Sequence, residues 1–295
     1  MKSFIKNLLG FSLFIIVLLT LVNIVFLTVI RKTDWDFRRR IESLRFRNPE
    51  FELLVLGHSL AADGIDTEYL TKTGIPSYNL SIGGSYPKSN LIQLDEYLSL
   101  YSTKPRVIIL GLASYMGRFD VENIHPIIEF TQKGHKYTLK DIPIVKFQWL
   151  GIQFLKKLVS DIHRDVELSY GQLRSPKISP DHTTYNSIKF SPDVYTSSTY
   201  IREIAELCTV NNIELVLIEM PGFKNTQNDS DVGPYQIDFG KGISYHLFNL
   251  NSISFCKIFD SERDWIANSH LNKYGANKFT RSMVDTLKNK GYPLF

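Results

Sequence analysis

The sequence predicts an α/β domain of three layers, in which helices cover both faces of a central, mainly parallel sheet, preceded by one transmembrane helix. After residue 50, short apolar runs of strand length alternate with helical patterns. Several of these runs are apolar at successive positions, which is typical of parallel strands buried on both faces. Before them, residues 7–30 contain no charged side chain and are long enough to cross a bilayer as a helix.

The apolar N-terminal segment is interpreted as an uncleaved, single-pass anchor. A cleavable signal peptide carries a shorter apolar region and a small-residue cleavage site, whereas this segment continues into IRKTDWDFRRR. The expected organisation is an anchor at 7–30, a basic juxtamembrane linker at 31–50 and an α/β domain at 51–295, with an insertion at about 115–195.

The positive charge of the chain is concentrated next to the anchor. Residues 31–47 hold seven Lys and Arg side chains against three acidic ones, and the whole chain has a net charge of +4. The rest of the chain is therefore balanced, and no nucleic-acid partner is expected. A basic segment that touches anionic lipid headgroups is the simpler interpretation.

The expected elements follow from hydrophobic periodicity. Strands are predicted at 51–57, 77–82, 106–112, 213–220 and 253–259. Helical faces are formed by Leu91, Leu94, Leu98 and Tyr101, by Ile201, Ile204 and Leu207, and by Ala276, Phe279, Met283, Val284 and Leu287. A further helix is expected within 148–163, packed on the core, with a lid or a membrane-contacting helix as the alternative. Cys208 and Cys256 lie in apolar contexts and are interpreted as small core residues rather than a disulfide.

Polar and glycine residues follow the predicted strands, where ligands meet a parallel sheet. The strand exits are Gly57-His58-Ser59, Gly83-Gly84-Ser85, Gly111-Leu112-Ala113-Ser114, and a last one that leads through Asp260 and Asp264 to His270. A serine hydroxyl, glycine N–H groups that hold an oxyanion, and a histidine that takes the serine proton together form an acyl-transfer site. Ser59, Gly83 or Gly84, and His270 are the candidates for these roles.

Each of these residues also has a structural interpretation. Ser59 could cap a helix, Gly83-Gly84 could form a tight turn, and His270 could pack at the start of the last helix. Asp63 and Asp66 are interpreted as turn and helix-cap residues. The combination of serine, glycines and histidine in this chain order favours the catalytic interpretation.

The early serine in VLGHSLAADGID and the late histidine in NSHLNKYGANKFT resemble the SGNH (GDSL-like) hydrolase superfamily over roughly residues 51–290. The resemblance implies a flavodoxin-like sandwich in which Ser59 is the nucleophile, His270 is the base, and the Ser59 amide with Gly84 or Gly83 binds the oxyanion. The nearest relatives that it suggests are membrane-anchored proteins that acylate bacterial cell-surface polymers.

The sequence departs from the family's pattern at three positions. His58 stands where the family's Gly-Asp-Ser has aspartate, and Ala113 stands where an oxyanion asparagine would fall. Ala267 stands where the family usually has an aspartate, three residues before the histidine. Asp264, or else Asp260, could replace it from the same loop, and Asn268 could orient the ring without supplying charge.

Two functional hypotheses follow. The first is a serine esterase or O-acyltransferase that acts on a cell-surface glycan or a lipid-linked saccharide through an acyl-Ser59 intermediate. The second is a catalytically impaired domain that binds glycan or scaffolds a membrane acyltransferase. Motifs for phosphate loops, dinucleotides and zinc are missing from the sequence, and the seven histidines lack metal-ligand spacing, so no cofactor and no metal are expected.

The orientation of the domain rests on two opposed indications. The basic excess after the anchor favours a cytoplasmic domain by the positive-inside rule. The family resemblance favours an extracytoplasmic one, and large translocated domains frequently override flanking charges. We expect the C-terminal domain to be extracytoplasmic.

Overall fold

The computed structural model describes residues 2–32, 50–117, 119–131, 142–159, 167–179, 187–266 and 270–292. Most of the basic linker expected at 31–50 lies outside the described residues. Ala267 and Asn268 lie outside them as well.

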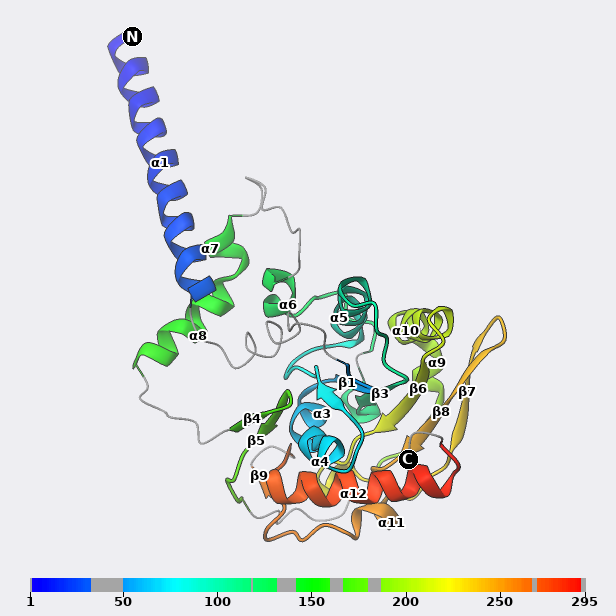
Figure 1. Cartoon of the computed structure of the whole chain (residues 1–295). Helices are drawn as coiled ribbons and strands as arrows, with labels where there is room; N and C mark the ends of the chain where they lie inside the picture. Colours follow the sequence, from blue (N-terminus) through cyan, green and yellow to red (C-terminus); the bar gives the residue numbers. More distant parts are fainter. Residues whose placement is uncertain are drawn as a thin grey trace.

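A six-stranded sheet forms the centre of the structure (Figure 1). Its strands, in spatial order, are β2 (Ser77–Asn79), β1 (Leu53–Gly57), β3 (Val107–Leu112), β6 (Glu214–Glu219), β8 (Ile243–Asn249) and β7 (Tyr235–Gly240). All neighbouring pairs are parallel except β7 with β8. The mainly parallel sheet predicted from the apolar runs is confirmed.

Helices cover both faces of the sheet and complete the three layers. The helices are α1 (Lys2–Lys32), α3 (Ser59–Gly64), α4 (Thr67–Lys72), α5 (Pro87–Leu100), α6 (Pro126–Thr131), α7 (Pro143–Lys146), α8 (Gln148–Val159), α9 (Asp193–Ser197), α10 (Thr199–Val210), α11 (Ile253–Cys256) and α12 (Lys273–Asn289). Alternate residues of β1 enter opposite cores: Leu54 and Leu56 pack with α5 and α10, whereas Leu53 and Val55 pack with α3, α4 and α12. This is the two-residue period of a strand covered on both sides.

The prediction of a last strand at 253–259 is wrong. Residues 253–256 form the short helix α11, because the Ser252 side chain accepts a hydrogen bond from the Phe255 N–H and caps a helical turn. The strand next to β6 is β8, which is joined to β7 through a turn at Gly240-Lys241-Gly242. The alternation of apolar and polar residues in YQIDFG and the two turn glycines are the sequence signals for this hairpin.

The region between β3 and α9 contributes two further pieces. A hairpin of β4 (Glu167–Ser169) and β5 (Gln172–Arg174) lies beside β2. The two are joined by a hydrogen bond from the Asn79 N–H of β2 to the Tyr170 carbonyl in the hairpin turn. The helix expected within 148–163 is present as α8, but it packs into a third cluster with α1 and α6 rather than onto the sheet. Cys208 and Cys256 are buried free thiols, as expected.

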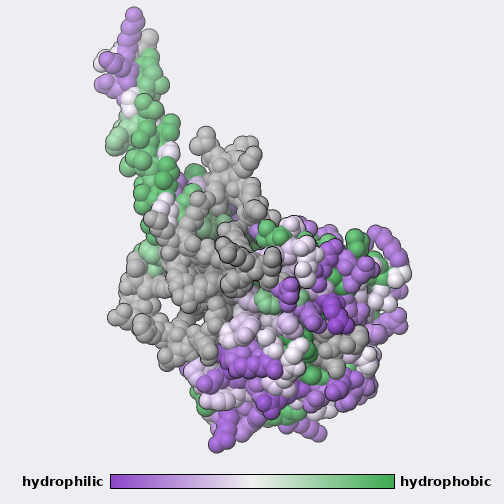
Figure 2. All heavy atoms as spheres, in the orientation of Figure 1, coloured by the Kyte–Doolittle hydropathy of each residue, from purple (hydrophilic) through white to green (hydrophobic). Residues whose placement is uncertain are grey.

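The N-terminal part of α1 projects away from the α/β body (Figure 1). Among the described residues, α1 is the helix that is long and apolar enough to cross a membrane, over Lys2–Ile30, with a mean hydropathy of 3.0 in an 18-residue window. Figure 2 shows hydrophobic side chains along most of its visible face, whereas the visible coloured surface of the body is largely hydrophilic.

Candidate active site

The serine stands at a strand-to-helix turn that requires glycine before it. Gly57 ends β1 with φ +147°, and a Cβ there would lie 2.1 Å from the Gly111 carbonyl oxygen. His58 is the N-cap of α3, and Ser59 is the first residue of that helix. The turn therefore presents the serine at the carboxyl edge of the sheet.

The histidine before the serine acts as a helix cap. Its Nδ1 accepts a hydrogen bond from the Leu60 N–H at 3.2 Å, which is the role that an aspartate at an N-cap plays. Burial lowers the pKa of His58 to about 4, so the ring is neutral near pH 7. Since Nδ1 is the acceptor, Nε2 carries the proton. The departure from Gly-Asp-Ser thus preserves the capping interaction.

The late histidine meets the serine. His270 Nε2 lies 3.0 Å from Ser59 Oγ, within hydrogen-bond reach. Burial lowers the pKa of His270, which leaves the imidazole neutral near pH 7 and able to accept a proton. Ser59 and His270, the nucleophile and base predicted from the sequence, are brought together across 211 residues of chain.

The carboxylate beside the histidine belongs to Asp63. Its Oδ2 lies 3.3 Å from His270 Nδ1, on the ring edge opposite the serine. Asp63 follows Ser59 by four residues on α3, so one helical turn aligns both side chains toward the same ring. The sequence predicted a turn or helix-cap role for Asp63. The i, i+4 spacing on a helix that begins at the serine was the signal that could have found it.

Asp264, the acid expected from the sequence, has other partners. Its carboxylate forms an ion pair with Lys278 at 2.6 Å and accepts the Asp260 N–H at 2.7 Å. Asp260 in turn accepts the Glu262 N–H. Both aspartates therefore hold the loop that leads to His270.

Asn272 completes the support of the histidine. Its Oδ1 accepts the N–H groups of Tyr274 and Gly275 and caps α12, while its Nδ2 donates to the Arg263 carbonyl at 2.6 Å. The block that begins His-Leu-Asn is therefore a helix cap whose asparagine anchors the preceding loop.

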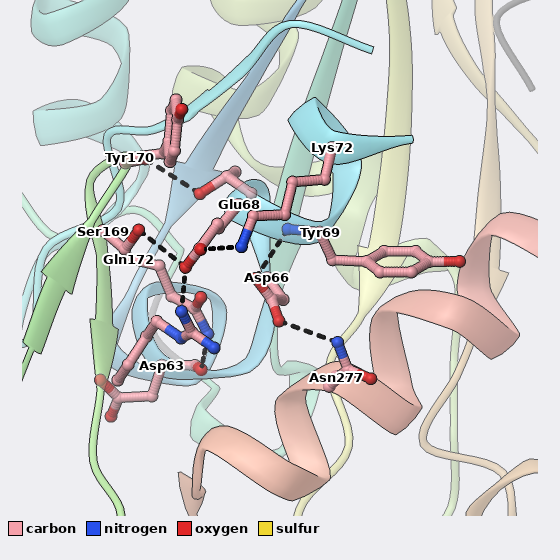
Figure 3. A network of polar contacts seen from close by, with 11 residues as sticks. Asp63, Asp66, Glu68, Tyr69, Lys72, Ser169, Tyr170, Gln172 and Asn277 are labelled. Carbon is pink, nitrogen blue, oxygen red and sulfur yellow. Dashed lines mark hydrogen bonds and ion pairs between the residues drawn. The ribbon is translucent and has the colours of Figure 1, made fainter. Parts of the chain in front are cut away.

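A polar network supports the segment that carries Asp63 (Figure 3). Gln172 Nε2 donates to the Asp63 carbonyl at 2.9 Å, and Glu68 is paired with Arg174, Lys72 and the Ser169 hydroxyl. The β4–β5 hairpin supplies Ser169, Gln172 and Arg174, so this hairpin braces the end of α3. The cap interpretation holds for Asp66, whose Oδ1 accepts the Tyr69 N–H at 3.0 Å and begins α4.

The predicted oxyanion glycines form a tight turn directly beside the serine. The Ser85 N–H donates to the Ile82 carbonyl across the turn, and Gly84 takes φ +76°, which favours glycine. A Cβ on Gly83 would lie 3.6 Å from Ser59 Cβ, whereas one on Gly84 would face His125 at 3.9 Å. Gly83 is therefore the glycine that faces the serine.

Free amide donors accompany this arrangement. Over the described ranges, the backbone N–H groups of Ser59, Gly83 and Gly84 donate no hydrogen bond. The Gly57 carbonyl accepts from the Ile82 N–H and from the Ser85 hydroxyl, so the two strand exits are tied together. The glycine turn and the start of α3 therefore offer unpaired N–H donors close to one another.

At the third strand exit, after β3, the serine is Ser114, and its polar groups are already hydrogen-bonded. Ser114 directs both its N–H and its hydroxyl to the buried Glu219 carboxylate, at 2.8 and 3.0 Å, and the Tyr195 hydroxyl also donates to that carboxylate. Burial raises the pKa of Glu219 to about 7. Ala113 is buried and supplies no side-chain donor.

The part of the chain that the structure describes contains no group of three or more His, Cys, Asp and Glu side chains arranged to hold a metal ion.

Comparison with known proteins gives a likeness in architecture only. The chain matches no family model and no curated protein. Among solved structures, it is similar to TesA, with 13% identity over 82% of this chain and 99% of the other and a TM-score of 0.35. It is also similar to a candidate platelet activating factor from Streptococcus pneumonia, with 11% identity over 91% and 98% of the two chains and a TM-score of 0.38.

Proposed function

We propose that this chain is a membrane-anchored serine esterase or O-acyltransferase that works through an acyl-Ser59 intermediate. One observation carries the proposal: His270 contacts Ser59 Oγ through its Nε2 and Asp63 Oδ2 through its Nδ1. A serine, a neutral histidine and an orienting carboxylate in this sequence of contacts activate a hydroxyl for attack on an ester. In this proposal Asp63, rather than Asp264, is the acid.

The first half of the reaction forms the acyl-enzyme. Ser59 Oγ attacks the ester carbonyl carbon while His270 Nε2 takes the hydroxyl proton, and the Ser59 and Gly83 N–H groups, with Gly84 as the alternative donor, stabilise the oxyanion. When the tetrahedral intermediate collapses, the bond to the leaving alcohol breaks and His270 returns its proton to that alcohol. Asp63 accepts from Nδ1–H, which keeps the Nε2 lone pair directed at the serine.

The second half transfers the acyl group. Water or an acceptor hydroxyl attacks the acyl carbon, His270 removes its proton, and the bond to Ser59 Oγ breaks as His270 protonates the serine. Water yields ester hydrolysis, and a saccharide hydroxyl yields O-acylation. The acceptor class that we propose is a cell-surface glycan or lipid-linked saccharide, as the family resemblance implies.

The proposed setting is a membrane, with α1 as a single-pass anchor and the α/β body on the extracytoplasmic side. The apolar length of α1 supports the anchor. A reporter enzyme that is active only outside the cytoplasm, fused to the C-terminus, tests the orientation: a cytoplasmic result would remove surface glycans as substrates.

The alternative of an impaired, glycan-binding or scaffolding domain retains one favourable observation. Ala113 and the engaged Ser114 leave the third strand exit without the side-chain oxyanion donor that the family's pattern has. The alternative predicts a serine that is not activated.

An active-site probe separates the two functions. The full chain in detergent micelles is treated with a fluorophosphonate, beside Ser59→Ala and His270→Ala and the matched exposed controls Ser99→Ala and His246→Ala. We expect wild type and controls to be labelled and both site variants to be unlabelled. Absence of labelling in folded wild-type protein would favour the scaffold.

A further inference from the structure

Two helices of the insertion lie against the C-terminal end of α1 (Figure 1). The Ile144 N–H of α7 donates to Asn23 Oδ1 of α1 at 2.9 Å. On α8, Gly151 allows close approach, since a Cβ there would lie 3.1 Å from Phe26 Cε2. Ile30 is 1% exposed and packs in one cluster with Phe147 and Leu150. The end of α1 is thus part of the folded body.

The length of α1 places these contacts at the membrane boundary. At 1.5 Å per residue, a helix over Lys2–Ile30 spans about 44 Å, whereas the hydrocarbon core is about 30 Å thick and takes about twenty residues. Most side chains from Phe4 to Val22 are exposed, and partly buried positions concentrate from Asn23 onward. If α1 spans the bilayer with its exposed part, α7 and α8 lie beside its last turns at the surface.

Five exposed apolar side chains lie on α7 and α8 or directly before α7. Ile142, Ile144, Val145, Ile152 and Leu155 are 36–61% exposed. On α8, Ile152 and Leu155 are three residues apart and share a face, while Leu150 is buried toward α1. An apolar strip that continues the surface of a membrane-length helix is typical of an interfacial element.

This strip is joined to the active site by direct packing. Ile82, which begins the glycine turn, lies in the same cluster as Ile30, Phe147 and Leu150. Beyond the turn, the His125 ring faces Gly84 and packs edge-on against Trp149 of α8, with ring centroids 5.4 Å apart. The glycine turn and the apolar strip are therefore parts of one packed unit.

We propose that Ile142–Leu155 forms a membrane-docking platform whose apolar side chains insert into the lipid headgroup region, holding the Ser59 site at the bilayer surface, where it takes an acyl donor carried by a membrane lipid. The occupant of the strip is the lipid bilayer, because the hydrogen bond and packing to α1 bring the strip to the same bilayer that receives the anchor. The donor class rests on the proposed function, whereas the membrane contact does not.

Depth-dependent quenching tests the contact directly. The full chain carries one NBD label on an introduced cysteine, Val145→Cys or Leu155→Cys, with Val210→Cys on α10 as the exposed control, after Cys208→Ala and Cys256→Ala. It is reconstituted in phosphatidylcholine–phosphatidylglycerol vesicles that contain doxyl lipids. We expect the labels at 145 and 155 to be quenched at least about twofold more than the label at 210. Equal quenching at the three sites would overturn the platform, as would blue-shifted but unquenched labels, which would mean that protein covers the strip.

Activity on two esters tests the donor class. Val145→Glu/Leu155→Glu is compared with Val210→Glu on soluble p-nitrophenyl acetate and on a long-chain p-nitrophenyl ester embedded in the vesicles. We expect the double variant to lose about tenfold on the embedded ester, because charged side chains leave the headgroup region, and to keep its rate on the soluble one. An equal loss on both esters would overturn the donor class. A wild type inactive on both would contradict the proposed function, while the quenching result would still decide the platform.

Discussion

Ser59 and Ser114 both follow a buried strand at the same edge of the sheet, yet their surroundings differ. The Ser59 hydroxyl meets a neutral histidine, and its N–H is free within the described structure. The Ser114 hydroxyl and N–H are both taken by the Glu219 carboxylate. A serine at a strand exit is therefore not sufficient for catalysis: the group that faces it decides whether its proton can be removed and whether its amide can bind an oxyanion.

The largest effect is expected from replacing the two serines, which should change the rate of ester hydrolysis very differently. Ser59→Ala should lower kcat/KM for ester hydrolysis by at least about a thousandfold, since the nucleophile is lost. Ser114→Ala should leave the rate within about twofold and lower the melting temperature, because a donor to a buried carboxylate is removed. Measured rates that fall equally in both variants would mean that the two exits form one site.

The second effect tests the assignment of the acid. Asp63→Asn should reduce kcat by about a thousandfold or more, because an amide permits the tautomer in which Nε2 carries the proton and the serine loses its base. Steady-state kinetics on a soluble ester measure it, with the exposed Asp95→Asn as control. An unchanged kcat in Asp63→Asn would contradict the role of Asp63.

The third prediction concerns how protonation of Glu219, the partner of Ser114, changes stability with pH. The folded Glu219 keeps its proton up to pH about 7, whereas an unfolded glutamate loses it near 4.5. Between these values the unfolded state binds fewer protons, so stability falls as pH rises, by about 3 kcal/mol from this group. Glu219→Gln should flatten that slope in urea unfolding followed by near-ultraviolet circular dichroism from pH 5 to 8. A parallel slope in the two proteins would show that Glu219 does not titrate in this window.

The smallest effect concerns the cap beside Ser59. Folded His58 takes up a proton only near pH 4, whereas the unfolded residue does so near 6.5. The unfolded state therefore binds more protons between these values, and stability falls as pH drops, by about 2 kcal/mol at pH 5. His58→Asn keeps a capping acceptor without this titration, so its loss of stability from pH 7 to 5 should be smaller than that of wild type. Equal losses would contradict the neutral, buried state of His58.

Much of the fold could be predicted from local pattern. The apolar runs at β1, β3 and β6 and the helical faces of α5, α10 and α12 alternate as expected, because burial on both sides of a parallel strand leaves a continuous apolar run. The failure at α11 has a local cause: four apolar-rich residues fit a strand or a helical turn, and the cap at Ser252 decides between them.

The site divides in the same way. Ser59, His270 and the glycine turn could be found from strand exits and chain order. Asp63, which we propose as the acid, was not found, because the prediction considered only the loop before the histidine, where Asp264 forms an ion pair with Lys278. The carboxylate that faces the ring comes from the serine's own helix.

The sequence by itself determined the class of the sheet, the apolar N-terminal helix and which serine and histidine we propose as nucleophile and base, since these depend on periodicity and on residue type at a strand end. Only the tertiary structure decided which carboxylate faces His270, which serine is free to react, and that α8 packs on the end of α1. These are contacts between segments far apart in the chain. They depend on the geometry of packing and on competition among charged partners, which no local pattern encodes.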